Sequence, residues 1–159
     1  MSNLVVCDID GVIADCSHRL SWAEAKMYDD FYARVSGDEP ISDGITLLLK
    51  LAAHLDSGDR IVFLTGRRED CRQDTMDWLR KNFCYSYEAI YMRRKGDHRE
   101  PYIVKKELYA EIIRMFESRN IIFDHIYFID DDPENVKAVC EGDDFVTGLT
   151  FGINRLKEE

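Results

Sequence analysis

Short apolar runs of strand length alternate along the chain with longer segments in which apolar residues recur at helical spacing. The strand-like runs cover residues 3–7, 60–64, 88–92, 126–129 and 145–151. Because helical segments lie between them, we expect the strands to run parallel and to be joined by helices. The pattern predicts an α/β fold with a mainly parallel sheet and helices on both of its faces.

Five helices are expected between these strands. Ser21-Trp22-Ala23-Glu24 has the form of a capping box, which predicts a helix that begins there and ends near Gly37. A second helix should end near Gly58, and Pro101 suits the first turn of a later one. The expected inner faces are Ile45, Leu48, Leu49, Ala52 and Leu55, then Cys71, Thr75, Trp78 and Leu79, then Val104, Leu108, Ile112 and Met115. In Asp132-Pro133 we interpret the aspartate as the N-cap of the last helix rather than as a metal ligand.

The polar residues best suited to chemistry follow three of the predicted strands directly. They are Asp8 and Asp10, then Thr65, Gly66 and Arg67, then Asp130 and Asp131. In open parallel sheets, ligands bind beyond the carboxyl ends of the strands. We therefore expect these three segments to meet at one crevice.

Several carboxylates would converge in that crevice. Two carboxylates about 4 Å apart repel by roughly 4 kcal/mol at an effective dielectric constant near 20. Three or four together require a cation or protonation, and oxygen ligands alone favour a hard ion, with Mg²⁺ the usual one beside a phosphate. The candidate metal site therefore consists of Asp8, Asp10, Asp130 and Asp131.

Four segments in this order resemble the motifs of the haloacid-dehalogenase-like (HAD) superfamily. They are Asp8-Ile9-Asp10-Gly11-Val12, the strand ending in Thr65, Lys105 early in a helix, and the strand ending in Asp130-Asp131. The resemblance implies a three-layer Rossmann-like fold and a phosphatase that uses Mg²⁺. Lys106 lies next to Lys105 but points about 100° away on a helix, so only one of them faces the site. We choose Lys105.

The resemblance also implies a role for each catalytic residue. Asp8 is expected to be the nucleophile that forms an aspartyl-phosphate, and Asp10 the acid and base. Thr65 would hydrogen-bond the transferred phosphoryl group, and Lys105 would neutralise its charge. Mg²⁺ would be held by the side chains of Asp8 and Asp130 and by the backbone carbonyl of Asp10, with support from Asp131.

Composition indicates how many domains the chain has and in which compartment we expect it. The chain has 159 residues, of which 45% are hydrophobic and 33% charged, which fits a single domain over residues 1–159. The apolar runs are too short to span a membrane, and no signal peptide is visible. The five cysteines form no CxxC pair and are odd in number, which is typical of reduced thiols in a cytoplasmic protein.

The net charge of −10 argues against a diffuse basic surface that coats nucleic acid. It hides a local basic cluster, however, between residues 93 and 106. Few residues separate the motifs, so we expect no large cap domain and an open crevice that suits a bulky substrate.

A narrower resemblance concerns this basic cluster. The segment from Met92 to Arg99, continued by Val104-Lys105-Lys106-Glu107, is similar to one in the 3′-phosphatase domain of phage-type polynucleotide kinases. Arginines at positions 19 and 67 match that domain as well. The resemblance implies that the substrate's phosphates are contacted by Arg19, Gly66, Arg67, Arg93 and Arg99.

This resemblance has limits that leave alternatives open. Pro101-Tyr102 stands where that domain is acidic, Val12 replaces a common Thr, and no phosphate loop of the type that binds ATP is present. Each arginine could instead form a surface ion pair. We expect a polynucleotide or nucleotide 3′-phosphatase acting in nucleic-acid repair. The alternatives are a small-molecule phosphatase, such as a 5′-nucleotidase for deoxynucleoside monophosphates, and a non-catalytic regulatory module that is phosphorylated on Asp8.

Overall fold

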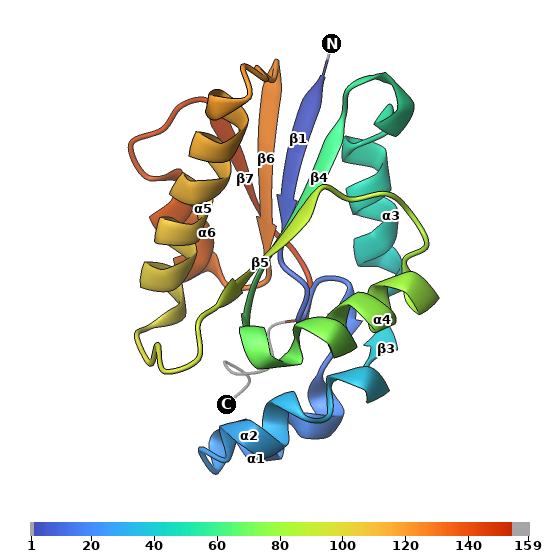
Figure 1. The fold of residues 1–159 in the computed structure, drawn as a ribbon, viewed down its shortest axis with the longest axis vertical. Helices are drawn as coiled ribbons and strands as arrows, with labels where there is room; N and C mark the ends of the chain where they lie inside the picture. The colour runs from blue at the N-terminus through green and yellow to red at the C-terminus, as the bar shows by residue number, and fades with distance from the viewer. Residues whose placement is uncertain (1, 154–159) are drawn as a thin grey trace.

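The structure, a computed structural model, describes residues 2–153 and contains a parallel five-stranded sheet (Figure 1). Every neighbouring pair in the sheet is parallel, in the order β5-β4-β1-β6-β7. The strands are β1 (Asn3–Cys7), β4 (Arg60–Arg68), β5 (Ala89–Arg93), β6 (His125–Asp130) and β7 (Val146–Thr150). The predicted α/β architecture is confirmed.

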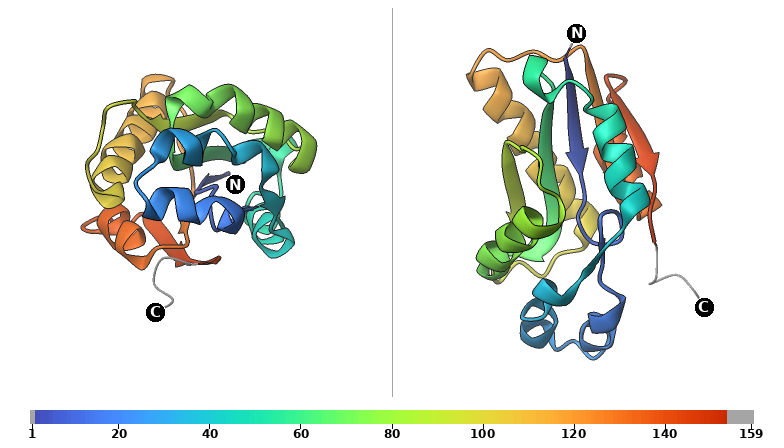
Figure 2. Two further views of the ribbon diagram at one scale, coloured as in Figure 1. Left: turned by 90° about the horizontal axis from the view of Figure 1, so that it is seen from below. Right: turned by 90° about the vertical axis from the view of Figure 1, so that its right-hand side faces the viewer.

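Helices cover both faces of this sheet (Figure 2). The helices α3 (Ser42–Leu51) and α4 (Arg72–Asn82) contribute to one hydrophobic core, and α5 (Pro101–Ser118) and α6 (Pro133–Cys140) contribute to the other. A central strand of such a three-layer fold is buried on both sides, so it is apolar at consecutive positions. In β1, the side chains of Val5 and Cys7 enter the first core, whereas those of Leu4 and Val6 enter the second.

The segment after β1 departs from the prediction. The expected single helix is two short ones, α1 (Leu20–Glu24) and α2 (Tyr28–Tyr32), and between them Lys26 has a positive φ of 58° that breaks the helical path. The capping-box interpretation is wrong because Ser21 lies inside α1 and the N-cap position is Arg19, whose side chain forms no cap hydrogen bond. A buried polar network, described below, fixes the chain at Arg19 instead.

The remaining elements are short. They are the two-stranded antiparallel pair β2 (Ala14–Asp15) and β3 (Glu39–Pro40), and the 3-10 helices η1 (Ser17–Arg19), η2 (Val35–Gly37), η3 (Leu55–Ser57) and η4 (Glu69–Cys71). Seen from below, α1 and α2 lie across the end of the sheet at which the strands point their carboxyl ends (Figure 2). Within residues 2–153 this insert is the only covering of that end between β1 and β4, and it is no large cap domain. No described helix is both long and apolar enough to cross a membrane.

Candidate active site

Asp8 is the first residue after β1, and it is buried where that strand leaves the sheet. Its backbone N–H still donates to the carbonyl of Ile129 on β6, at 2.9 Å, which holds the chain in register with the neighbouring strand. The carboxylate accepts a hydrogen bond from the N–H of Ile9 on Oδ1, at 2.8 Å, and its Oδ2 lies 3.1 Å from Nζ of Lys105. Strand pairing and these two contacts therefore fix one orientation of the side chain.

Lys105 enters the site from the beginning of α5. Its Nζ donates to Oδ2 of Asp130 at 2.6 Å and bridges to Asp8, and the side chain is almost fully buried. Burial alone would lower its pKa, but the charges of Asp130 and Asp8 outweigh burial and raise the pKa well above the usual value. The neighbouring Lys106 is exposed. The structure thus places Lys105, as the helical spacing predicts, at the carboxylates.

Asp130 ends β6 and is held from two sides. Its Oδ1 accepts hydrogen bonds from the N–H of Asp132 at 2.9 Å and from Nδ2 of Asn135 at 3.2 Å. Asp132 itself caps α6, accepting the N–H of Glu134 at 2.9 Å, so the predicted N-cap role is confirmed. The sequence reasoning missed Asn135. Its position one turn into the helix that follows the Asp-Asp motif was the available signal.

A third carboxylate, that of Asp131, completes an acidic cluster. Ligand atoms of Asp8, Asp130 and Asp131 all lie within 4.8 Å of one another, close enough for one metal ion. Gly11, at φ 83°, makes this approach possible, since a Cβ there would collide with the Asp131 carboxylate and with the carbonyl of Ile153. The glycine of the first motif is therefore required by space as well as by its backbone conformation.

Two carboxylates of the acidic cluster, those of Asp8 and Asp131, have raised pKa values. Burial first, and then the neighbouring carboxylates, raise the pKa of Asp8 well above its usual value even though Lys105 lowers it. Burial and the charge of Asp130 likewise raise the pKa of Asp131 to about 8. One ammonium group does not balance three carboxylates, and these oxygen ligands suit a hard divalent cation such as Mg²⁺. The residues present therefore fit the predicted metal.

Asp10 lies two residues beyond Asp8 but in a different environment. Its Oδ1 accepts from Nη2 of Arg19 at 2.8 Å, and from Nε and Nη2 of Arg67 at 3.0 and 2.8 Å. Both guanidinium groups also bind Oδ2 of Asp38 at 2.8 Å. Burial raises the pKa of Asp10, but Arg67 and Arg19 together bring it below its usual value. Its side chain lies outside the acidic cluster, so only its backbone could serve the metal.

This network contains Arg19 and Arg67, which the sequence predicts to contact the substrate. Both side chains are fully buried and bind carboxylates of the protein. The carboxylate that both arginines share, and that the sequence reasoning missed, is Asp38, which lies 29 positions from Arg67 and in no recognisable motif. No local pattern could have indicated it.

Thr65 and Gly66 lie on β4 beside this network, where the pairing with β5 is irregular between Thr65 and Arg68. The Thr65 hydroxyl is buried and accepts the N–H of Arg67 at 3.1 Å, which leaves its proton available to a ligand. Gly66 accepts hydrogen bonds on its carbonyl from the Tyr32 hydroxyl at 3.2 Å and from Nε of Arg93 at 3.3 Å. A Cβ at Gly66 would meet nothing within 4 Å, so the chain is open to the crevice there.

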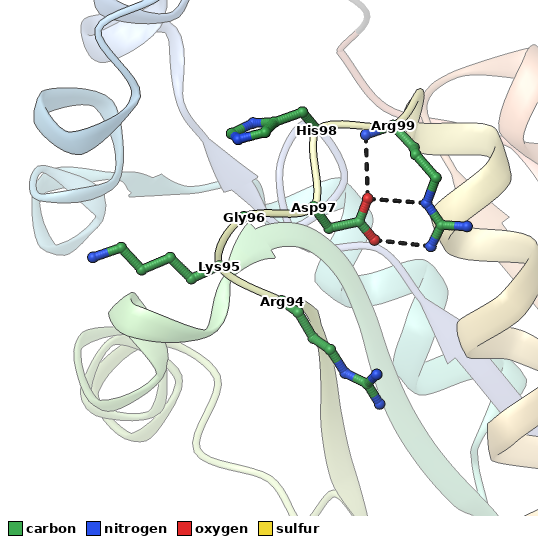
Figure 3. A pocket seen from close by; sticks show the side chains of 6 residues that line it. All are labelled: Arg94, Lys95, Gly96, Asp97, His98 and Arg99. Carbon is green, nitrogen blue, oxygen red and sulfur yellow. Dashed lines mark hydrogen bonds and ion pairs between the residues drawn. The ribbon is translucent and has the colours of Figure 1, made fainter.

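The basic loop, residues 94–99, connects β5 to α5 and lines a shallow surface depression (Figure 3). Arg93 supports the loop from beneath, since its Nη1 donates to the carbonyls of Asp97 at 3.0 Å and Arg99 at 2.7 Å. Arg99 makes two-pronged ion pairs with Asp97 and Glu107. Of the two interpretations that the sequence left open for Arg99, the structure shows the surface ion pair. In Figure 3 the side chains of Lys95 and His98 point away from that pair.

The sequence is similar to those of known proteins. Residues 2–138 match the family model described as the polynucleotide kinase PNKP phosphatase domain. A putative bifunctional polynucleotide kinase/RNA ligase of Autographa californica nuclear polyhedrosis virus is 34% identical over 110 residues, which are 69% of this chain and 15% of that protein. The chain thus spans a small part of the curated relative that it matches.

Two solved structures have the same fold. A chain of the Pnkp1/Rnl/Hen1 RNA repair complex superposes with a TM-score of 0.69 at 23% identity, covering 94% of this chain and 43% of that one. A haloacid dehalogenase-like hydrolase, SP0104 from Streptococcus pneumoniae, gives a TM-score of 0.52 at 13% identity, covering 87% and 80%. With the family model and the viral relative, the chain therefore belongs to the phosphatase-domain family of PNKP-type polynucleotide kinases, within the HAD phosphatases.

Proposed function

We propose that this chain removes the 3′-phosphate from polynucleotide ends, as a Mg²⁺-dependent phosphomonoesterase that works through an aspartyl-phosphate. The observation that carries the proposal is the contrast between Asp8 and Asp10. Asp8 lies in an acidic cluster beside Lys105, whereas Asp10 is held on one oxygen by two arginines. One carboxylate is therefore placed to attack and the other to exchange a proton.

In the first step a carboxylate oxygen of Asp8 attacks phosphorus. The bond from phosphorus to the sugar oxygen breaks, and that oxygen takes a proton from the Asp10 carboxyl, which holds the proton only once the negative charge of the bound phosphate opposes the lowering of its pKa by Arg67 and Arg19. The Thr65 hydroxyl hydrogen-bonds the phosphoryl group in transit. Lys105, 3.1 Å from Asp8, stabilises the negative charge on the phosphoryl oxygens.

The second step returns the enzyme to its starting state. Asp10, now a carboxylate, accepts a proton from water while the water oxygen attacks phosphorus. The bond between phosphorus and Asp8 breaks, and inorganic phosphate leaves. Arg19 and Arg67 favour this carboxylate form because their charges lower the pKa of Asp10.

The metal would be held by the side chains of Asp8 and Asp130 and the backbone carbonyl of Asp10, with Asp131 supporting it. When bound, Mg²⁺ would screen the repulsion between the Asp8 carboxylate and the phosphate dianion. Asn135 would orient Asp130 by donating to the oxygen that Lys105 does not use. Each metal-facing carboxylate thus has a defined partner within the protein.

Three observations support a polynucleotide as the substrate. The family model is named for a polynucleotide kinase phosphatase domain, and the viral relative is a putative polynucleotide kinase/RNA ligase. The insert after β1 consists of short helices and forms no large cap domain, which suits a bulky substrate. The basic loop lies at the same end of the sheet, tied to Gly66 through Arg93.

The test is release of inorganic phosphate from an oligonucleotide that carries a 3′-phosphate, compared with the same oligonucleotide phosphorylated at its 5′ end and with mononucleotides. We expect the 3′-phosphorylated oligonucleotide to have the highest kcat/KM, and activity to disappear with EDTA and return with Mg²⁺. Asp8→Asn should lose at least about 10³-fold in activity.

Other results would favour a different function. A preference for mononucleotide 5′-phosphates would indicate a small-molecule phosphatase. No turnover of any phosphomonoester, with stable phosphorylation of Asp8, would indicate a regulatory module. Wild-type activity in Asp8→Asn would exclude the aspartyl-phosphate mechanism altogether.

A further inference from the structure

Asp38 is a buried carboxylate outside the acidic cluster and outside every motif of the sequence. Its Oδ1 accepts from Nε of Arg19 at 2.8 Å, and its Oδ2 accepts from Nη2 of both Arg19 and Arg67 at 2.8 Å. Nε2 of His18 lies 2.7 Å from the same Oδ1. The side chain of Asp38 is completely shielded from solvent. Burying a carboxylate is costly unless it is paired and hydrogen-bonded, and Asp38 meets this condition through Arg19 and Arg67.

The partners of Asp38 are also the partners of Asp10. Nη2 of Arg19 contacts both carboxylates, and so does Nη2 of Arg67. The two guanidinium groups and two carboxylates therefore form a closed ring of four ion pairs. Two neighbouring guanidinium groups repel each other. The negative charge of Asp38 offsets this repulsion, so both arginines have a second carboxylate partner besides Asp10.

The network opens to solvent at Asp10. The Asp10 side chain is 23% exposed, whereas those of Arg19, Arg67 and Asp38 are at 0%. All three guanidinium contacts to Asp10 converge on Oδ1. Within residues 2–153, no hydrogen bond reaches Oδ2 of Asp10. One oxygen is therefore fixed and the other remains available for a reacting group.

We propose that Asp38 is a positioning residue for the acid–base group: through Arg19 and Arg67 it fixes the orientation of Asp10, so that Oδ2 meets the oxygen of the leaving group. The inference rests on the proposed function, and it adds a residue that the HAD motifs do not contain. Asp38 touches no substrate. It acts only through Asp10, in the transfer of the proton to the leaving oxygen and in the later transfer of a proton from water.

Neighbouring elements hold Asp38 itself in place. Nε1 of Trp78 on α4 donates to the Asp38 carbonyl at 2.7 Å, and Nη1 of Arg67 donates to the hydroxyl of Thr75 on the same helix at 3.0 Å. The helix thus supports both the carboxylate and one of its arginines. Such support behind a reacting group keeps its geometry ready before the substrate arrives.

The test uses leaving groups of different acidity. p-Nitrophenol leaves readily as an anion, whereas the sugar hydroxyl of an oligonucleotide is a poor leaving group that needs a proton. The quantity to compare is kcat/KM, because it reports the steps up to departure of the leaving group. We expect Asp38→Asn to lower kcat/KM by about 10²-fold for a 3′-phosphorylated oligonucleotide, the scale of general acid catalysis, and to change it far less for p-nitrophenyl phosphate.

Asp59→Asn is the matched control. Asp59 is another buried aspartate, but it accepts the backbone N–H groups of Asn3 at 2.7 Å and His54 at 2.8 Å at the opposite end of the sheet. Its substitution should lower stability without separating the two substrates. His18→Ala provides a second test, because His18 lies partly exposed at the edge of the network. It should show the same selectivity as Asp38→Asn, with a smaller loss, in a protein that folds.

The outcomes separate the two claims. If the wild-type protein hydrolyses neither ester, the proposed function is wrong. If it hydrolyses both, and Asp38→Asn lowers both values of kcat/KM equally or lowers neither, the positioning role is wrong. Should Asp38→Asn not fold, equal effects of His18→Ala on the two esters would overturn the inference by themselves.

Discussion

The acidic cluster and the arginine network differ in their balance of charge. In the acidic cluster, the carboxylates of Asp8, Asp130 and Asp131 surround the single ammonium of Lys105. The arginine network consists of Asp10 and Asp38 with Arg19 and Arg67. The acidic cluster needs a cation from outside the chain, whereas the charges of the arginine network are equal in number.

This difference gives two neighbouring aspartates different chemistry. Burial raises the pKa of both Asp8 and Asp10. At Asp8 the nearby carboxylates reinforce burial, and at Asp10 the arginines outweigh it, so one pKa ends above its usual value and the other below. The residue type is the same, and the difference in pKa follows from the partners.

The largest effect is expected when the acidic cluster loses its own cation. Lys105→Met should lower kcat/KM by at least about 10³-fold, because it removes a preorganised charge from the developing phosphoryl oxygens. Mg²⁺ should bind no more weakly than to the wild-type protein, since the neighbouring carboxylates lose a competing cation. Phosphate release and calorimetric titration with Mg²⁺ measure the two effects.

Lys106→Met is the control for this experiment. It changes the same residue type one position along α5, but its side chain is exposed. We expect wild-type activity and wild-type affinity for Mg²⁺. Weaker metal binding in Lys105→Met would show that Lys105 serves to assemble the cluster rather than to complement a charge deficit.

The sequence predicted the acidic cluster more fully than the arginine network. The acidic cluster follows from strand ends, because the parallel sheet brings the ends of β1 and β6 together. Helical geometry showed that only one of Lys105 and Lys106 can face the site, and the family resemblance favoured Lys105. These are local patterns, and the fold only has to place them side by side.

The arginine network required information that no local pattern holds. Asp38 binds Arg19 and Arg67 from 19 and 29 positions away, and its own surroundings carry no motif. Arg19 and Arg67 were expected to contact the substrate because they match arginines of the 3′-phosphatase domain that the chain resembles. The expected helix from Ser21 to Gly37 failed because tertiary contacts at Arg19 set where α1 begins.

The pH dependence of stability offers a second test of the charge deficit. In the metal-free protein, burial and Asp130 raise the pKa of Asp131 from 3.8 to about 8. Between these values the folded protein holds a proton that the unfolded chain has lost, so the free energy of unfolding falls as the pH rises toward 8. Mg²⁺ binds the deprotonated carboxylates and should stabilise the protein more at about pH 8 than at about pH 5.

Melting temperatures with EDTA and with Mg²⁺ at the two pH values measure this effect. Asp131→Asn should flatten the metal-free profile. The lowered pKa of Asp10 acts with the opposite sign, because its contribution is present above the unfolded pKa and is lost as the pH falls through the folded one. A metal-free melting temperature that rises steadily between pH 5 and 8 would contradict the deficit in the acidic cluster.

The smallest effect is expected at the basic loop, where Arg99 is paired with carboxylates but exposed. Arg99 makes ion pairs with Asp97 and Glu107, and its side chain is 47% exposed, so water and salt screen those contacts. Arg99→Ala should change kcat/KM for a 3′-phosphorylated oligonucleotide by less than about 3-fold and leave the melting temperature nearly unchanged, because exposed ion pairs contribute little. A balanced network thus matters only when it is buried, as at Asp38. A loss above about 10-fold for oligonucleotides, with mononucleotides unaffected, would instead mean that Arg99 leaves its ion pairs to contact a phosphate of the strand.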